Sequence, residues 1–196
     1  ECQRNCKRND EEIKSFISAT AASGGILMFS DKLRLLDDEQ RKLLSYMFPI
    51  NKQAATPLDF TTSYIPGILD CGVKDKTRTV VLINWHDEEK VMGYDADGCH
   101  AYEFWSGKYL GVVNGRYESK IAPHCCEVLH FTEAGAPITV VGSENTLVPS
   151  ALQSLEGDSL RVTFAKKGER LVVRADSITA PGCDVESIAE GLFRLT

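Results

Sequence analysis

The sequence predicts a mainly β protein, an antiparallel Greek-key β-sandwich preceded by a short α/β segment. About eight runs of β-forming residues follow residue 64, roughly ten residues apart, and this spacing is typical of a two-sheet sandwich. Residues 102–126 alternate strand-forming residues with tight-turn dipeptides, whereas residues 9–50 have a helix–strand–helix pattern. We therefore expect an α/β segment over residues 1–50, a polar linker over residues 51–63 and the sandwich over residues 64–196.

The first helix is expected to begin after Asn9. Asn is a favourable N-cap residue, and Glu12 stands three positions later, which completes a capping box. One apolar stripe at helical spacing follows, formed by Ile13, Phe16, Ile17 and Ala21. The two glycines at positions 24 and 25 are expected to end the helix.

A strand and a second helix are expected next. Residues 26–29 contain no polar side chain, which is typical of a strand that is buried on both faces of a parallel sheet. Asp37 and Gln40 predict the capped start of a helix that stops at Pro49. A single strand forms no sheet, and the residues downstream supply no parallel neighbours. We therefore expect this segment to be part of a larger α/β unit.

The sandwich is expected to open with an irregular strand over residues 65–73 and a clearer one over residues 77–85. The second of these is apolar on both faces. An acidic turn at residues 87–89 then predicts that residues 91–94 pair back with it.

Residues 102–126 predict an antiparallel meander of three strands. Ser106 with Gly107, and Asn114 with Gly115, are dipeptides that accept the positive φ angles of tight hairpin turns. Pro123 fits a bend into a further strand over residues 125–131. Later strands are expected at residues 138–141, 160–164, 171–174 and 191–195, with a hairpin around Gly168 joining the second and third of them.

The charge balance excludes one class of partner, and the hydropathy pattern excludes a membrane span. The net charge is −6, and no block rich in Lys and Arg exists beyond Lys166 and Lys167. A nucleic-acid-binding protein needs a basic face, so we expect no nucleic-acid partner. No apolar run approaches the length of a membrane helix.

The cysteines and histidines predict neither a metal site nor a cofactor. Seven cysteines occur without a C-x-x-C pair, and the four histidines are scattered over different predicted strands. Cys2 and Cys6 have helical spacing, but no His or carboxylate pattern completes a site. Unpaired thiols favour a reducing compartment, hence the cytoplasm. An enzyme that uses Cys and His is an alternative that needs a Cys–His pair, for which the sequence has no motif.

Two stretches resemble a known family. The first resembles the aromatic meander in the C-terminal β-sandwich of α-galactosidase-like glycoside hydrolases. It comprises residues 102–105, 107–111, Gly115 and residues 122–124. Cys125 stands where that family has a glycine, a difference that affects a turn. Residues 16–49 resemble the last βα unit of the (β/α)8 barrel in the same family.

The resemblance implies a function for the whole protein rather than for this segment alone. Residues 1–50 would be the end of a (β/α)8 barrel, and the retaining hydrolysis of terminal α-galactosides, without a metal, would use two aspartates on earlier barrel strands. This chain begins after those strands, so no catalytic residue is assigned. The implied partners are the missing N-terminal catalytic barrel and, through it, an α-galactoside or a related carbohydrate.

Asp31 is the one candidate for substrate binding. It follows the carboxyl end of the predicted barrel strand, the face on which barrel enzymes build their sites. The alternative is that Asp31 caps the next turn through its own hydrogen bonds.

The aromatic residues of the sandwich define the second functional hypothesis. Exposed, coplanar rings would form a platform for carbohydrate, whereas buried rings would be core, their commoner fate. The residues concerned are Trp85, Tyr102, Phe104, Trp105 and Tyr109. The alternative function is therefore a carbohydrate-binding or purely structural β-sandwich module. A segment cut from a barrel would also expose apolar surface, from which we expect self-association.

Overall fold

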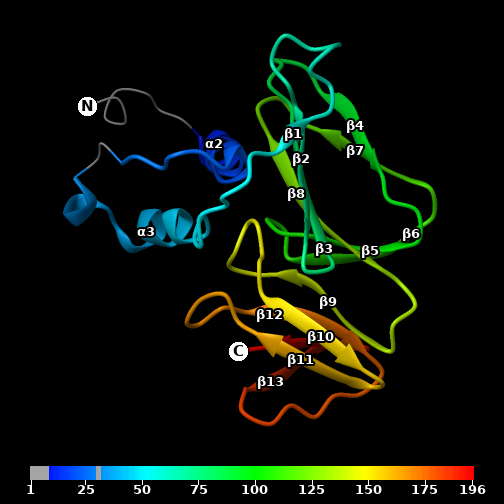
Figure 1. Cartoon of the computed structure of the whole chain (residues 1–196). Coiled ribbons are helices and arrows are strands. Elements are labelled where there is room, and N and C mark those ends of the chain that lie inside the picture. Colours follow the sequence, from blue (N-terminus) through cyan, green and yellow to red (C-terminus); the bar gives the residue numbers. More distant parts are fainter. Residues whose placement is uncertain (1–8, 30–31) are drawn as a thin grey trace.

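A computed structural model of the chain describes residues 9–29 and 32–196. In these residues antiparallel sheets dominate, and the two α-helices lie on one side of the largest sheet (Figure 1). The predicted mainly β fold class is confirmed. Neither helix in the described ranges is long and apolar enough to cross a membrane.

Helix α2 (Asp10–Ser23) begins where the sequence predicts. The Glu12 amide donates to Asn9 Oδ1 at 2.8 Å, the Asn9 amide donates to Glu12 Oε2 at 3.2 Å, and Gly24 ends the helix with φ 64°. The apolar stripe of the sequence is only partly buried, because Phe16 is 55% exposed. The buried face is rotated towards small residues, and it consists of Ser15, Ile17, Ser18, Ala21 and Ala22.

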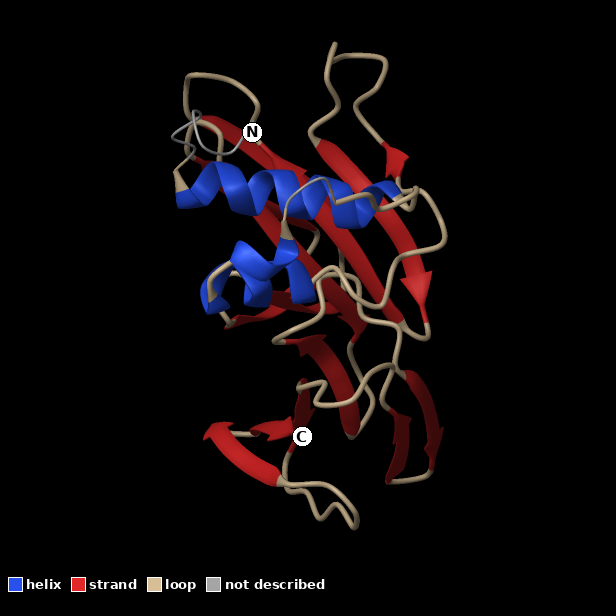
Figure 2. Ribbon diagram, turned by 90° about the vertical axis from the view of Figure 1, so that its left-hand side faces the viewer, coloured by secondary structure: helices blue, strands red, loops and turns tan. Residues whose placement is uncertain are grey.

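The rotation has a physical cause in the loops that α2 covers. Ser15 Oγ donates a hydrogen bond of 2.7 Å to the His124 carbonyl, and Ser18 Oγ accepts one of 3.0 Å from the Trp105 indole. Two serines therefore satisfy polar groups of the sandwich that an apolar stripe would leave unpaired. Figure 2 shows the resulting position of α2 across the strands of the large sheet.

The second helix, α3 (Asp38–Ser45), also has its predicted start, a capping box between Asp37 and Gln40. A short 3-10 helix, η1 (Leu33–Leu35), precedes it. Residues 26–29 differ from the prediction, because they form no strand with any described segment. Ile26 is 92% exposed and Met28 84% exposed. A strand needs neighbours for its backbone hydrogen bonds, and the described sheets are built from residues further along the chain.

The largest sheet has the strand order β1-β2-β3-β8-β5-β6. Its strands are β1 (Thr56–Pro57), β2 (Ile68–Lys74), β3 (Thr77–Ile83), β8 (Cys126–Glu133), β5 (Cys99–Glu103) and β6 (Lys108–Val113). Strand β2 is irregular, as predicted, with a register shift between Asp70 and Val73. Strand β1 lies within the expected linker and pairs with β2.

A second layer covers one face of this sheet. It consists of β4 (Lys90–Asp95) and β7 (Arg116–Ile121), which pair with each other. Two predictions are therefore wrong: β4 does not pair back with β3, and the turn at Asn114 and Gly115 leads from the large sheet into the second layer rather than to a paired neighbour. The reason is burial, because Met92 and Ile121 of this layer pack against Val80 and Leu82 of β3.

The alternate residues of β3 face α2. Val81 and Ile83 pack in a cluster with Ile17 and Ala22 of the helix. Strand β3 is thus buried on both faces because β4 and β7 cover one and α2 covers the other.

The C-terminal part forms a four-stranded sheet, β13-β14-β12-β9, and a separate β10–β11 hairpin. The strands are β9 (Ile138–Ser143), β10 (Leu152–Glu156), β11 (Ser159–Thr163), β12 (Leu171–Ala175), β13 (Val185–Ala189) and β14 (Leu192–Leu195). The predicted hairpin around Gly168 is wrong, because β11 pairs with β10 whereas β12 pairs with β9 and β14. Strand β14 confirms the predicted closing strand.

Candidate functional site: a cleft between helix α3 and the sandwich

A cleft of about 260 Å³ separates α3 from the sandwich. Its walls come from four parts of the chain that are distant in sequence: α3, the end of β5 with the turn after it, the loop after β9 and the loop before β12. The side chains that matter for its chemistry are Lys42, Tyr46, Tyr102, Trp105, Glu144 and Arg170. The cleft therefore exists only in the folded chain.

The turn after β5 is fixed by a buried carboxylate. Glu103 is 6% exposed, and its two oxygens accept hydrogen bonds from the backbone amides of Trp105 (3.1 Å), Ser106 (2.6 Å) and Val128 (3.1 Å). Gly107 completes the turn with φ 67°. Three amides on one carboxylate hold the backbone rigidly, so this wall of the cleft is preorganised.

Trp105 forms an apolar wall. Its indole nitrogen is bonded to Ser18, and its ring meets Tyr46 edge-on, with ring centroids 5.9 Å apart and planes at 67°. Lys14 Nζ lies 5.7 Å from the centroid of the same ring. The indole is thus fixed by both α2 and α3 while remaining partly exposed.

Tyr102 lines the floor of the cleft. Its side chain is 1% exposed and stacks on the His130 ring, with centroids 6.1 Å apart and planes at 17°. Its hydroxyl has no hydrogen-bond partner in the described part of the chain. Burial, with a smaller contribution from the Glu144 charge, raises the pKa of this phenol, so it is a neutral hydrogen-bond donor.

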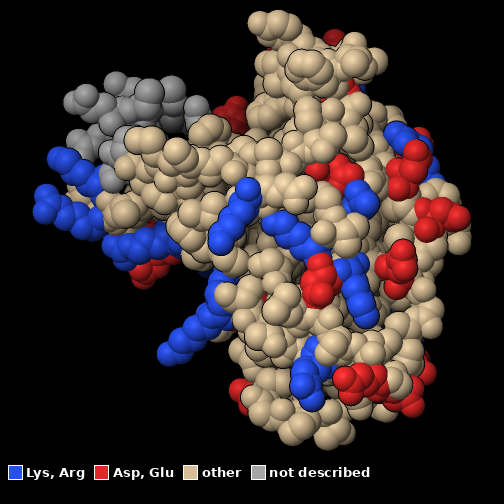
Figure 3. Space-filling view, viewed as in Figure 1, with Lys and Arg blue, Asp and Glu red and all other residues tan. Residues whose placement is uncertain are grey.

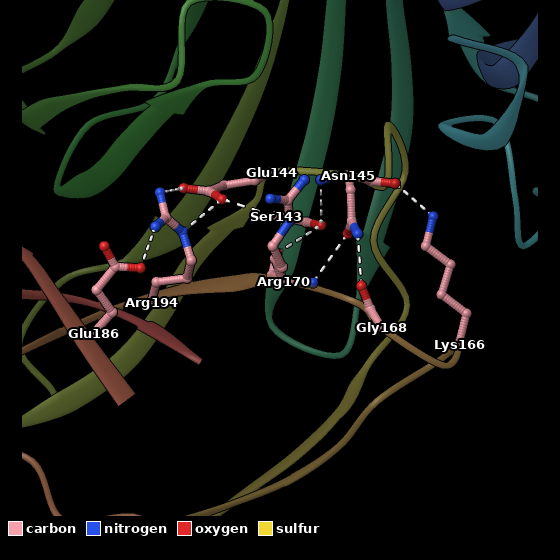
Figure 4. Close-up of polar contacts among 8 residues, drawn as sticks. All are labelled: Ser143, Glu144, Asn145, Lys166, Gly168, Arg170, Glu186 and Arg194. Atoms are coloured by element: carbon pink, nitrogen blue, oxygen red, sulfur yellow. Dashed lines mark hydrogen bonds and ion pairs between the residues drawn. The ribbon is translucent and has the colours of Figure 1, made fainter. Parts of the chain in front are cut away.

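Glu144 and its arginines form the wall opposite α3, shown in Figure 4. Arg194 of β14 donates from Nε and Nη2 to the two Glu144 oxygens, both at 2.7 Å, and from Nη1 to Glu186. The hydrogen bond to Glu144 is the main cause of the raised pKa of Arg194. Arg170 Nε lies 3.8 Å from Glu144. The other N–H groups of the Arg170 side chain meet no acceptor among the residues described.

The loop before β12 is tied to α3 by a lysine. Lys166 Nζ donates to the Asn145 carbonyl (Figure 4). It also donates, at 3.2 Å, to the Ser45 carbonyl at the end of α3. Asn145 in turn donates from Nδ2 to the Gly168 carbonyl at 2.7 Å and accepts at Oδ1 from the Arg170 amide at 3.0 Å. The position of Arg170 in the cleft therefore follows from contacts of its backbone rather than of its guanidinium.

The residues predicted from sequence lie only partly in this cleft. Asp31 lies outside the described residues. Tyr102 and Phe104 are buried, as the core interpretation predicts, at 1% and 5% exposure. Trp85 donates to the Pro66 carbonyl at 2.9 Å, and the Tyr109 hydroxyl is bonded to His100 at 2.7 Å. The five aromatic residues therefore form no coplanar exposed platform.

The described cysteines are poor candidates for a nucleophile. Burial raises the pKa of Cys71 to about 12 and that of Cys126 to about 11. Both thiols are protonated at neutral pH, and the thiolate is the reactive form. Cys126 contacts Ser18 at 3.5 Å rather than a histidine. Cys2 and Cys6 lie outside the described residues, and in residues 9–29 and 32–196 no three His, Cys, Asp or Glu side chains gather as metal ligands would.

Sequence reasoning missed Lys42, Tyr46, Glu144 and Arg170. They come from three segments, and no short motif links them. The one local signal was the polar stretch Ser143, Glu144 and Asn145 directly after an apolar strand, because polar residues at a strand end often line a site.

Comparison with known proteins gives a likeness in structure only. No family model matches the sequence, and no curated protein matches it. Similar solved structures include α-galactosidase I from Mortierella vinacea, with 15% sequence identity and a TM-score of 0.54; the match covers 66% of this chain and 37% of that one. Another is a putative α-N-acetylgalactosaminidase from Bacillus halodurans, with 16% identity and a TM-score of 0.55; the match covers 65% of this chain and 33% of that one. An isomalto-dextranase from Arthrobacter globiformis matches over 91% of this chain and 34% of its own (16%, TM-score 0.52).

These matches confirm the predicted resemblance to α-galactosidase-like glycoside hydrolases at the level of the fold. The chain spans about a third of the length of the structures it matches. It therefore has the fold of a part of such enzymes, consistent with a C-terminal portion.

Proposed function

We propose that this chain is the non-catalytic C-terminal segment of a retaining α-galactosidase-like glycoside hydrolase. Its role is to complete and support a catalytic barrel that hydrolyses terminal α-galactosides. The observation that carries the proposal is the combination of a shared fold with coverage of only 33–37% of the two α-glycosidase structures. Residues 1–50 would then be the last part of the (β/α)8 barrel, and the catalytic aspartates would lie upstream.

The surface around residues 26–29 supports this role. Ile26 and Met28 are almost fully exposed in a segment without a single polar side chain. Burying one such side chain stabilises a protein by roughly 1.5–3 kcal/mol. Exposed side chains of this size in a continuous run favour a partner surface, and the neighbouring strand of a barrel would cover them and complete the strand.

Helix α2 would connect the two units. Its small-residue face packs on β3 and β8 of the large sheet, while Phe16 is 55% exposed on another side. In Figure 3, a broad uncharged surface over the helical side lies between groups of Lys and Arg side chains. A helix that packs against the sandwich on one face and against the barrel on another would couple the folding of the two units, so the sandwich would stabilise the barrel.

Asp31 is proposed to lie at the sugar-binding rim of the completed barrel. The proposal rests on its position directly after the apolar segment, at the end of a barrel strand where sites are built. In an active product of the longer gene, Asp31→Asn would lower kcat/KM for an α-galactoside. Asp37→Asn, at the cap of α3, serves as the control for loss of a nearby acidic charge.

The deciding experiment is an assay with p-nitrophenyl α-D-galactoside. It compares this chain with the product of the same gene extended upstream by the length of a barrel. We expect hydrolysis by the longer product alone. Hydrolysis by the isolated chain would refute the proposal and direct attention to the cysteines and histidines.

A variant pair tests the docking surface in the longer product. Ile26→Asp should abolish activity or soluble expression, because it places a charge in the barrel sheet. Leu152→Asp changes another exposed apolar residue, on β10 and 64% exposed, and should leave activity unchanged. Equal activity of the two variants would argue against residues 26–29 as a barrel strand.

The compartment is a separate proposal. The five cysteines in the described ranges are all free, which supports folding in a reducing compartment such as the cytoplasm. Labelling with a maleimide reagent after denaturation, without reductant, should modify every cysteine of protein taken from its native source. Protection of any pair would indicate a disulfide and an oxidising compartment.

A further inference from the structure

We propose that the cleft between α3 and the sandwich is a binding site for an acidic saccharide, a sugar ring that carries a carboxylate. The site lies outside the barrel and does not depend on the role proposed above. Three features of the cleft point to this ligand: its hydrogen-bond donors, its charge and its aromatic wall.

The first step concerns the hydrogen-bond donors of the cleft. The Tyr102 hydroxyl is buried and has no partner among the residues described. Arg170 and Lys42 also line the cleft, and their exposed N–H groups are open to a ligand. A buried hydroxyl without a partner costs free energy, and buried polar groups are normally satisfied. A ligand rich in acceptor oxygens would satisfy all three groups.

The second step is the excess of positive charge. The charged side chains that line the cleft are Lys42, Arg170 and Glu144, so the lining carries one net positive charge. Arg194 pairs with both Glu144 and Glu186, and Arg170 Nε lies 3.8 Å from Glu144, so the Nη groups of Arg170 and the ammonium of Lys42 are the cationic groups open to a ligand. A guanidinium presents its N–H groups in a planar fork that fits a carboxylate, and Lys acts as a compact point charge. The expected ligand is therefore an anion.

The third step is the aromatic wall. The rings of Trp105 and Tyr46 are both partly exposed and line the cleft beside the cations. Aromatic rings favour the apolar faces of a ligand, while polar groups fix its orientation. A simple anion would leave these rings without a partner, and a neutral sugar would leave Arg170 and Lys42 without one. A sugar acid uses both parts of the cleft.

The test measures binding of D-galacturonate to the 196-residue chain by titration calorimetry or ligand-observed NMR. D-Galactose is the control without the carboxylate, and acetate is the control without the ring. We expect galacturonate to bind at least about tenfold more tightly than either control, as one charge-assisted pair implies. Its affinity should also fall as salt increases.

Substitutions locate the site. Arg170→Gln should weaken galacturonate binding about tenfold or more, and Lys42→Gln, at an exposed position, should weaken it severalfold. Arg161→Gln, on an exposed face of β11, is the matched control and should leave the affinity unchanged. Lys42 makes no contact that the fold needs, so the test holds even if the Arg170 variant folds poorly.

Tyr102→Phe separates binding from structure. Removing a hydroxyl without a partner should leave the melting temperature unchanged or raise it, while the affinity for galacturonate falls severalfold. A hydroxyl with a structural role would lower the melting temperature instead.

The proposal is overturned if galactose or acetate binds as tightly as galacturonate. It is also overturned if the Arg170 and Lys42 variants bind galacturonate like the unmodified chain. The absence of α-galactosidase activity in the longer gene product would contradict the proposed function and leave this result unaffected.

Discussion

His130 shows how one buried side chain sets the pH range of the fold. The ring is fully buried, its Nδ1 accepts from the Ser143 amide at 3.3 Å, and its Nε2 donates to the Leu147 carbonyl at 3.0 Å. The neutral ring satisfies both partners, whereas a protonated Nδ1 would leave the Ser143 amide without an acceptor. Burial lowers the pKa of His130 to about 4.

Stability should therefore fall as the pH drops from about 6.5 to about 4. In this window the unfolded chain binds a proton at His130 and the folded chain does not, so acid favours unfolding. The expected loss is about 3 kcal/mol, and above the unfolded pKa this group adds no further pH dependence. Urea unfolding at pH 7.5, 5.5 and 4.0 measures it.

The variant His130→Gln isolates this contribution from the carboxylates that titrate in the same range. Its free energy of unfolding should depend less steeply on pH than that of the unmodified chain. Equal slopes would show that His130 does not control the acid sensitivity.

Other features at the residue scale follow from the sequence because they are local. Both capping boxes, at Asn9 with Glu12 and at Asp37 with Gln40, are written in four consecutive positions. The carboxylate of Glu103 differs, because one of its three amide donors, Val128, comes from another strand. Spacing along the chain gives no sign of that contact.

At the scale of the elements, Gly142 of β9 marks where the C-terminal sheet meets the large one. A Cβ at this position would lie 2.5 Å from Tyr102 Cδ1 and 2.9 Å from His130 Nδ1. Gly142→Ala should therefore destabilise the chain by about 1–3 kcal/mol, the usual cost of overpacking. The change in the midpoint of urea unfolding measures it.

Gly25→Ala is the matched control for this substitution. The nearest atom to a Cβ there is Ser23 Oγ at 3.8 Å, and Gly25 has an ordinary φ. This variant should unfold at nearly the same urea concentration as the unmodified chain. If both variants unfold alike, β9 does not pack as closely on Tyr102 and His130 as the structure indicates.

Strand pairing was harder to predict than the positions of the strands. Residues 160–164 and 171–174 both have strand-forming patterns around a Gly168 turn, yet β11 pairs with β10 and β12 with β9 and β14. Strand β10 was not predicted, because its residues alternate between polar and apolar over a short run. The contacts of Lys166 and Asn145 fix the segment between β11 and β12 in a conformation that does not form a hairpin. Pairing depends on contacts between distant segments, which periodicity does not encode.

At the scale of the whole molecule, the exposed apolar segment predicts self-association. Ile26 and Ile50 line the same small depression, and Met28 and Leu35 are further exposed apolar residues of the helical part. In water, such a surface lowers its free energy by pairing with another copy. Sedimentation velocity at increasing concentration should therefore show a shift from monomer to dimer.

The double variant Ile26→Asp with Met28→Asp should remain monomeric over the same range. Leu152→Asp is the control and should associate like the unmodified chain. A monomer at every concentration of the unmodified chain would contradict the prediction.

The packing of α2 on the large sheet also determines where this polypeptide can be divided. Ala22 is fully buried against side chains of the sandwich, in one cluster with Val81 and Val128. For a transplant of the sandwich onto another enzyme, the polar stretch at residues 51–63 would be the obvious place to cut. That cut would separate α2 from β3 and β8. The transferable module therefore begins before Asn9 and includes the helix.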